Sequence, residues 1–425
     1  MRMKFNRSSQ LVIVAAASLL AAVLIAGCET LTVDFVFVAS SKAAGANQYG
    51  EIDVFEINSE SGRMRQIPTS PFPSEGRNPV AETVSADYQN LFVVNQDDDT
   101  IVQFIIGSDG KLYPYNTVNT PGIYPLAVTA NKSNLFVVDT YQPLALASTA
   151  HPCSGSIAVY PLTAATSSTP VGLTTPATNA AVNGSYWPLA LPGVNTDTTG
   201  CTSSGHILVP TAVNVVASGS YVYVTAYDST VTPTVGYVFA FSVGSGGVLT
   251  PLSGSPFAAG VQPSAIASDP TSTYVYVTDQ ASNNVRGYSV ASGNLTALSG
   301  SPYPAGDQPS AIVVDPTYPF AYVANSQDAT VEAYSISGGK LSFLGNSSTP
   351  VTYTTDLQPI AIGVDPSTNH FLFTVNFLGN TVSDFELNST QGVLLDAQFS
   401  PFATSAQPVA VAAVPHNGTG GGIQQ

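Results

Sequence analysis

A nine-residue stretch, QPSAIASDP at 262–270, returns almost unchanged as QPSAIVVDP at 308–316. Its core is a proline followed two residues later by alanine and then by a short apolar run. The pattern starts at seven places in the chain, at Pro79, Pro125, Pro210, Pro263, Pro309, Pro359 and Pro408. A spacing of about 48 residues indicates one supersecondary unit that is copied along the chain, and this constrains the fold more than length does.

Each unit is predicted to contain four antiparallel strands. An alternating strand is followed by an Asp-Pro turn, by a β-branched and aromatic strand such as YVYVT at 274–278, and by two further strands around a glycine turn. Alternating Val, Tyr and Phe between such turns are typical of strands, and no segment shows a helical period. Four strands repeated at this spacing predict an all-β fold, a seven-bladed β-propeller with four-stranded antiparallel blades.

The two ends of the chain predict how the ring closes. The first unit begins at FVFVAS (35–40), which matches a second strand, and the chain ends with QPVAVAAV (407–414), a first strand with nothing after it. We therefore expect the C-terminal strand to pair with the N-terminal blade, because this pairing removes two open sheet edges. The predicted propeller spans 28–414, with an insertion in the third blade at about 140–206 and a flexible tail at 415–425.

Residues 1–27 are predicted to be an export signal. Three basic residues precede an uncharged apolar run that ends in IAGC at 25–28, as in exported proteins. This ending resembles the bacterial lipobox, which implies cleavage before Cys28 and attachment of lipid to that cysteine. The alternative is an uncleaved membrane-spanning helix. Both place the rest of the chain outside the cytoplasm, tethered to a bacterial membrane and facing the periplasm or the cell surface.

Composition excludes several functions. The chain has 11 Lys and Arg against 27 Asp and Glu, and only 9% of its residues are charged, against about 25% in ordinary soluble domains. So few cations exclude binding to nucleic acid or to another polyanion. The sequence has no Rossmann fingerprint, P-loop, H-E-x-x-H or G-x-S-x-G, so neither a cofactor nor a metal is predicted. We expect a monomer.

The repeats, including YVTD at 276–279, resemble the lactonase-type seven-bladed propellers and their YVTN-repeat branch over roughly 31–414. The resemblance implies hydrolysis of a lactone. Catalytic members carry Pro-Arg-His at the start of an inner strand, whereas the matching positions here read Pro-Val-Ala at 79–81 and Pro-Ser-Ala at 263–265. The named substrate of the family, a phosphorylated and cytosolic sugar lactone, also fits poorly with an exported chain whose few cations are scattered.

Two functions follow from these observations. The first is a non-enzymatic, membrane-tethered propeller that presents a loop-built face to a protein or glycan partner. The alternative is a hydrolase of a neutral sugar lactone that uses Glu82 or a histidine of the insertion as its base.

Glu82 departs from the internal pattern. The third position after each repeated proline is aliphatic in six units, whereas the second blade has Glu82 there. A carboxylate on the innermost strand could act as a general base or bind a ligand. The structural alternative is a carboxylate paired with a neighbour, for which Arg77 is the nearest cation in the sequence.

The insertion carries two cysteines and the only tryptophan of the chain. Cys153 and Cys201 are predicted to lie on one face and to form a disulfide, which export to an oxidising compartment favours. The alternative is a zinc site that also uses His151 and His206. Trp187 is predicted to pack the insertion onto the propeller, or to provide a stacking platform for a sugar.

Amide side chains precede most of the repeated prolines and are predicted to surround one mouth of the channel. The predicted set is Asn78, Gln262, Gln308, Gln358 and Gln407. They either form hydrogen bonds between neighbouring blades or bind a sugar or peptide. NQDDDT at 95–100 is predicted to be a solvated turn, because it lacks the glycine and the later glutamate of a calcium loop.

Overall fold

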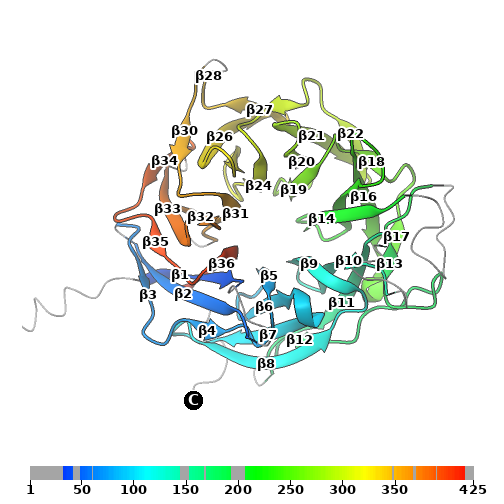
Figure 1. The fold of residues 1–425 in the computed structure, drawn as a ribbon, viewed down its shortest axis with the longest axis horizontal. Helices are drawn as coiled ribbons and strands as arrows, with labels where there is room; N and C mark the ends of the chain where they lie inside the picture. The colour runs from blue at the N-terminus through cyan, green and yellow to red at the C-terminus, as the bar shows by residue number, and fades with distance from the viewer. Residues whose placement is uncertain are drawn as a thin grey trace, which may run out of the picture.

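A computed structural model describes residues 32–41, 48–59, 61–143, 153–166, 169–192, 206–346, 349–366, 370–388 and 390–416. Seven antiparallel sheets surround a central axis (Figure 1), which confirms the predicted seven-bladed propeller. Each sheet has four main strands, and the repeated proline lies at or near the start of the innermost one. Within the described ranges, no helix is both long and apolar enough to cross a membrane.

The blades are numbered one to seven along the chain. Blade one contains β36 (Pro408–Pro415), β1 (Thr32–Ser40), β2 (Glu51–Asn58), β3 (Met64–Gln66) and β4 (Phe72–Pro73). Blade two contains β5 (Pro79–Val84), β6 (Asn90–Asn95), β7 (Thr100–Ile106) and β8 (Leu112–Asn119), with the 3-10 turn η1 (Gln96–Asp98). Blade three contains β9 (Ile123–Ala130), β10 (Asn134–Tyr141), β11 (Ser156–Thr163), β12 (Gly172–Leu173) and β13 (Trp187–Pro188). Blade four contains β14 (Leu208–Val215), β15 (Tyr221–Asp228), β16 (Val235–Val243), β17 (Leu249–Pro251) and β18 (Phe257–Ala258), with η2 (Ser245–Gly247).

Blades five to seven follow the same order. Blade five contains β19 (Pro263–Ser268), β20 (Tyr274–Asp279), β21 (Asn284–Ala291), β22 (Asn294–Ala297) and β23 (Tyr303–Pro304). Blade six contains β24 (Pro309–Val314), β25 (Phe320–Asn325), β26 (Thr330–Ser337), β27 (Lys340–Phe343) and β30 (Thr352–Thr354), beside the small hairpin β28 (Gly345–Asn346) and β29 (Thr349–Pro350). Blade seven contains β31 (Pro359–Val364), β32 (Phe371–Asn376), β33 (Thr381–Asn388), β34 (Val393–Asp396) and β35 (Phe402–Ala403).

The ring closes as predicted. The C-terminal strand β36 pairs antiparallel with β1, with Val36 opposite Ala413 and Val38 opposite Val411, and Figure 1 shows red β36 beside blue β1. The other edge of β1 pairs with β2, so neither edge is left open. The fold continues past the predicted boundary at 414, because β36 ends at Pro415 and the ring of His416 lies 5.3 Å from that of Phe35.

The hydrophobic core consists of seven clusters that lie between neighbouring blades. The second strands carry alternating Val, Phe and Tyr, so each contributes side chains to the cluster on either side of it. Three of these tyrosines, Tyr223, Tyr276 and Tyr322, donate their hydroxyl to a carbonyl in the glycine turn of the next blade. The YVYV pattern therefore supplies both the packing and the polar contact between blades.

The residue that ends the second strand holds the loop before the inner strand of the same blade. Asp279 accepts backbone N–H bonds from Val261 and Gln262 at 2.9 and 3.0 Å, and Asn95 donates to the Ser74 carbonyl at 3.3 Å. A glycine three residues before the repeated proline packs on this side chain. A Cβ at Gly76 would lie 2.4 Å from the Asn95 amide, so only glycine fits.

Replacing Gly76 with alanine is expected to lower the free energy of unfolding by about 1–3 kcal/mol, because buried Asn95 must move. The measurement is urea unfolding followed by circular dichroism. Gly363→Ala is the matched control, since a Cβ there would approach no atom closer than 3.4 Å. Equal destabilisation by both substitutions would contradict the predicted contact.

The predicted insertion at 140–206 needs a correction. Its middle contains β11 and β12, the third and fourth strands of blade three, so the extra residues are divided between two connections. One joins β10 to β11, and the other joins β12 to β14 through β13. Residues 144–152 and 193–205, within these connections, lie outside the described ranges.

Candidate functional site

The side of the ring where the inner strands begin is here named the mouth, and the opposite side the base. The predicted amide residues lie at the mouth, as their place before the prolines requires. Their carbonyls accept the N–H that follows the second strand of the same blade, as in Gln96 N to Asn78 O at 2.9 Å and Ser326 N to Gln308 O at 3.0 Å. The corresponding bonds of Gln262, Gln358 and Gln407 are 2.9–3.0 Å long.

Blade-to-blade hydrogen bonds at the mouth use the backbone of these residues. The N–H of Gln308 donates to Asn283 Oδ1 at 3.0 Å, and the N–H of Gln407 donates to Asn380 Oδ1 at 2.8 Å. Within the described part of the chain, the side-chain amides of the four glutamines form no hydrogen bond. Gln308 and Gln407 therefore link neighbouring blades through their backbone N–H groups and not through the predicted side-chain amides, whereas the N–H of Gln262 donates to Asp279 of its own blade.

Tyr124 takes the place of the amide residue in blade three. Its φ of 55° is left-handed, as is that of Asn78, Gln308, Gln358 and Gln407, a conformation uncommon for a bulky residue. The N–H of Tyr124 donates to Asp99 Oδ1 at 2.7 Å, and its carbonyl accepts the Thr140 hydroxyl at 2.6 Å. Its ring meets that of Tyr141 edge-on at 6.0 Å. Two aromatic rings are thus fixed at the mouth of blade three.

The acidic turn at 95–100 is held in place by hydrogen bonds from Arg77 and Asn78. The prediction of a solvated turn did not include these contacts. Arg77 binds Asp98 through Nε to Oδ1 at 2.6 Å and through its backbone N–H to Oδ2 at 2.7 Å. Asn78 Nδ2 donates to Asp97 Oδ1 at 3.2 Å. Arg77 therefore pairs with Asp98 and leaves Glu82 without the partner that the sequence suggested.

Glu82 lies between blades one and two. It is opposite Val93 in the register of β5 and β6, the same register as Ile266 opposite Val277 in blade five, and Val93 packs in the core between blades one and two. The residue is 8% exposed, and both carboxyl oxygens are buried without a hydrogen bond. Because the carboxyl is buried between two blades, it cannot contact a substrate in the channel. The geometry therefore does not support Glu82 as a catalytic base.

Burial raises the pKa of Glu82 to about 8, so the carboxyl is neutral over most of the physiological range. The N–H groups of Ala39 and Ala412 oppose this shift. Neither N–H group forms a hydrogen bond with the carboxyl, so burial dominates the shift.

His206 and Asp228 form a polar pair at the mouth of blade four. His206 precedes β14, Asp228 ends β15, and the register places Leu208 opposite Asp228. His206 Nδ1 lies 2.5 Å from Asp228 Oδ2, with the histidine side chain 36% exposed and the aspartate 1% exposed. Although burial acts in the opposite direction, hydrogen bonds from Thr230 and His206 lower the pKa of Asp228. A buried carboxylate thus holds a half-exposed imidazole.

The pair lies beside the insertion. Leu208 N donates to Ser154 Oγ at 3.1 Å, and Gln142 N donates to the Ser154 carbonyl at 3.0 Å. These bonds connect the strand after His206 to the end of β10, where Tyr141 lies. The sequence indicated His206 as a possible zinc ligand or as one of the insertion histidines that could act as a base, and it did not identify Asp228 as its partner.

Cys153 and Trp187 belong to the structural part of the insertion. Cys153 is buried and disulfide-bonded, which leaves it no thiolate to bind zinc. Cys201 and His151, like the lipidation site Cys28, lie outside the described ranges, so the Cys153–Cys201 pairing stays a prediction. Trp187 is 4% exposed and packs in the core between blades three and four. Its ring therefore has no face open for stacking a sugar.

Positive charge is scarce at the mouth. Among the described residues there, Arg77 is bound to Asp98 and Arg286 lies 3.8 Å from buried Asp279. Paired arginines on separate blades do not form the cluster of free cations that a phosphate group requires. No group of three or more metal-binding side chains occurs within the part of the chain that the structure describes.

Solved structures share this fold. A candidate 6-phosphogluconolactonase from Bacteroides fragilis matches with a TM-score of 0.66 and 19% identity over 91% of this chain and 99% of its own. Another from Bacteroides uniformis matches with a TM-score of 0.67 and 16% identity, over 90% and 100% of the two chains. The periplasmic gluconolactonase of Pseudomonas aeruginosa matches with a TM-score of 0.65 and 17% identity, over 90% and 99%.

These matches establish the architecture. The chain has the fold of the lactonase-type seven-bladed propellers. No protein-family profile and no curated protein matches the sequence. At such low identity the neighbours show the fold alone.

Proposed function

We propose that this protein hydrolyses a neutral sugar lactone at the mouth of the propeller, with His206 as the general base. The observation that carries the proposal is the pairing of a half-exposed imidazole with a buried carboxylate at 2.5 Å. Because Asp228 accepts the Nδ1 proton, the lone pair of the neutral imidazole is on Nε2, which can take a proton from water.

The reaction balances with water as the only co-reactant. His206 Nε2 removes a proton from water while the water oxygen bonds to the lactone carbonyl carbon. The ring C–O bond then breaks, and the imidazolium returns its proton to the leaving alkoxide, which gives an open hydroxy acid. Asp228 stabilises the imidazolium that forms between these steps, as in other histidine–carboxylate pairs. Asp228 is therefore a positioning residue.

The substrate class follows from the surroundings of the pair. Both arginines near the mouth are bound to carboxylates, which favours a neutral lactone over a phosphorylated one. Aromatic rings, as at Tyr124 and Tyr141, suit the faces of a sugar. The likeness to gluconolactonase-type propellers supports this function over the non-enzymatic partner binding that the sequence alone favoured.

The direct test is lactone opening by the purified chain. Gluconolactone is incubated with the protein and with buffer alone, and acid release is followed with a pH indicator. We expect an increase in rate that is proportional to protein concentration and that saturates with substrate. A rate equal to that of buffer at all protein concentrations would reject the proposal.

Tyr124→Gln is expected to raise KM roughly fivefold while kcat changes little, because the loss of one aromatic contact is worth about 1 kcal/mol. Glutamine is the residue at the same position in four other blades, so the fold should tolerate it. Tyr113→Gln, at an exposed position on the outer strand β8, is the control. An unchanged KM for Tyr124→Gln would show that the ring does not contact the substrate.

A further inference from the structure

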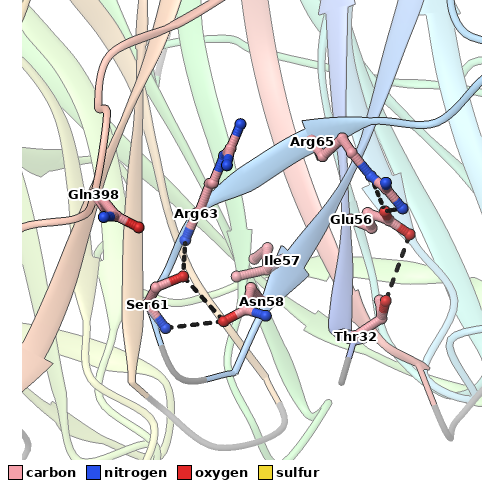
Figure 2. A pocket seen from close by; sticks show the side chains of 8 residues that line it. All are labelled: Thr32, Glu56, Ile57, Asn58, Ser61, Arg63, Arg65 and Gln398. Atoms are coloured by element: carbon pink, nitrogen blue, oxygen red, sulfur yellow. Dashed lines mark hydrogen bonds and ion pairs between the residues drawn. The ribbon is translucent and has the colours of Figure 1, made fainter. Parts of the chain in front are cut away.

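A pocket surrounded mostly by polar and charged residues lies far from the mouth, between blades one and seven (Figure 2). Its volume is about 300 Å³, and its walls include Thr32, Glu56, Ser61, Arg63, Arg65 and Gln398. Thr32 begins β1 and is opposite Asn58 at the end of β2, so the pocket opens toward the base. The two blades meet here through a hydrogen bond from Gln398 N to the Ser61 carbonyl at 3.3 Å.

The pocket has a net positive charge in an acidic protein. Arg65 Nε binds Glu56 Oε1 at 2.5 Å, and the Thr32 hydroxyl donates to Glu56 Oε2 at 3.4 Å, so these two charges compensate each other. Within the described ranges, no carboxylate lies within ion-pair distance of the Arg63 guanidinium. Counting the described residues only, one guanidinium therefore remains uncompensated, on a chain whose formal charge is −16.

The environment of Arg63 combines this charge with exposed apolar surface. Its guanidinium lies 5.0 Å from the centre of the Phe399 ring, and Phe399 is 65% exposed. The Gln398 carboxamide provides a further polar group in the pocket, whereas the Ser61 hydroxyl already donates to Asn58 Oδ1 at 2.9 Å. A guanidinium beside a neutral donor binds a phosphate or another oxyanion, while an exposed aromatic ring beside it is typical of residues at a membrane interface.

The position of the pocket agrees with the predicted anchor. Cys28, the predicted lipidation site, precedes Thr32 by four residues in the sequence, and four residues span at most about 14 Å. A lipid on Cys28 would hold this part of the base close to the bilayer surface. We propose that the pocket binds the phosphate of an anionic phospholipid headgroup and orients the propeller with its mouth away from the membrane.

The test separates pocket binding from the lipid anchor. The mature chain from residue 28 carries Cys28→Ser, which removes the acylation site and keeps every described residue. It is sedimented with vesicles of phosphatidylcholine alone or of phosphatidylcholine mixed with phosphatidylglycerol. We expect binding to the phosphatidylglycerol vesicles only, and a loss of roughly tenfold in the association constant for Arg63→Glu.

The matched control is Lys132→Glu, an equal charge reversal in the turn between β9 and β10 on the base, outside the pocket. It should lower the association constant far less than Arg63→Glu. An equal loss in both variants, or no binding to either vesicle, overturns the proposal. Glycerol 3-phosphate is titrated calorimetrically in parallel, and its binding without any vesicle binding assigns the pocket to a soluble phosphate ester and rejects the lipid. Circular dichroism melts verify that each variant is folded.

Discussion

Replacing His206 with glutamine is expected to lower kcat/KM for lactone opening by about 100-fold or more, the usual contribution of a general base. Glutamine retains a polar side chain of similar reach but cannot accept and return a proton. The loss should appear mainly in kcat, because the substrate contacts proposed for Tyr124 and Tyr141 would remain. Initial rates over a range of gluconolactone concentrations separate kcat from KM.

Two further variants make the result specific. His370→Gln removes an exposed histidine in the turn before β32 on the base, and we expect its activity to equal that of the unmodified protein. Asp228→Asn keeps an acceptor near Nδ1 but removes the charge that stabilises the imidazolium, so kcat should fall while KM is unchanged. Full activity of His206→Gln would exclude this histidine as the base and direct attention to another group at the mouth.

The propeller itself was predictable because its signals are local and repeated. Alternating strands, Asp-Pro turns and the proline-led inner strand occur in nearly every unit, and the unpaired first strand at 407–414 required a partner near 35–40. The pairing of Val38 with Val411 follows from that requirement. Such a prediction needs only strand periodicity and edge pairing, which the sequence contains directly.

The candidate site was less predictable because it depends on contacts between segments distant in sequence. His206 and Asp228 meet only through the exact register of β14 and β15. Arg77 was expected beside Glu82 from proximity in sequence, yet the turn at 95–100 offers Asp98 in better geometry for a bidentate contact. The departure of Tyr124 from the amide series was visible in the sequence, but its significance required the left-handed backbone at that position.

Glu82→Val is expected to stabilise the protein at both pH values, and considerably more at pH 8 than at pH 5. The carboxyl has a pKa of about 8 in the folded protein against an ordinary value of 4.5. Below pH 4.5 the carboxyl is protonated in both the folded and the unfolded state, so it does not change the free energy of unfolding with pH. Between 4.5 and 8 the unfolded chain releases the proton while the folded protein retains it. Stability therefore decreases as pH rises, by at most roughly 5 kcal/mol at 1.36 kcal/mol per pKa unit.

Valine is the natural replacement because Val128, Val213 and Val411 occupy the equivalent position in other blades. It fills an interface that is already apolar and removes two carboxyl oxygens that have no hydrogen bond. Urea unfolding at pH 5 and pH 8 measures the difference, and the variant should lose less stability over this range than the unmodified protein. Burial also raises the pKa of Asp139 to about 8, so part of the decrease in stability with rising pH should remain in the variant.

Glu82→Gln separates titration from packing. The amide does not titrate, so the contribution of this position to the pH dependence should vanish, as with valine. The variant should nevertheless be less stable than Glu82→Val at every pH, because a buried amide without partners costs about 1–3 kcal/mol. Lactone opening should persist in both variants, since the carboxyl lies between blades and away from the mouth. Loss of activity in well-folded Glu82→Gln would instead restore Glu82 as a catalytic group and imply that blades one and two separate during the reaction.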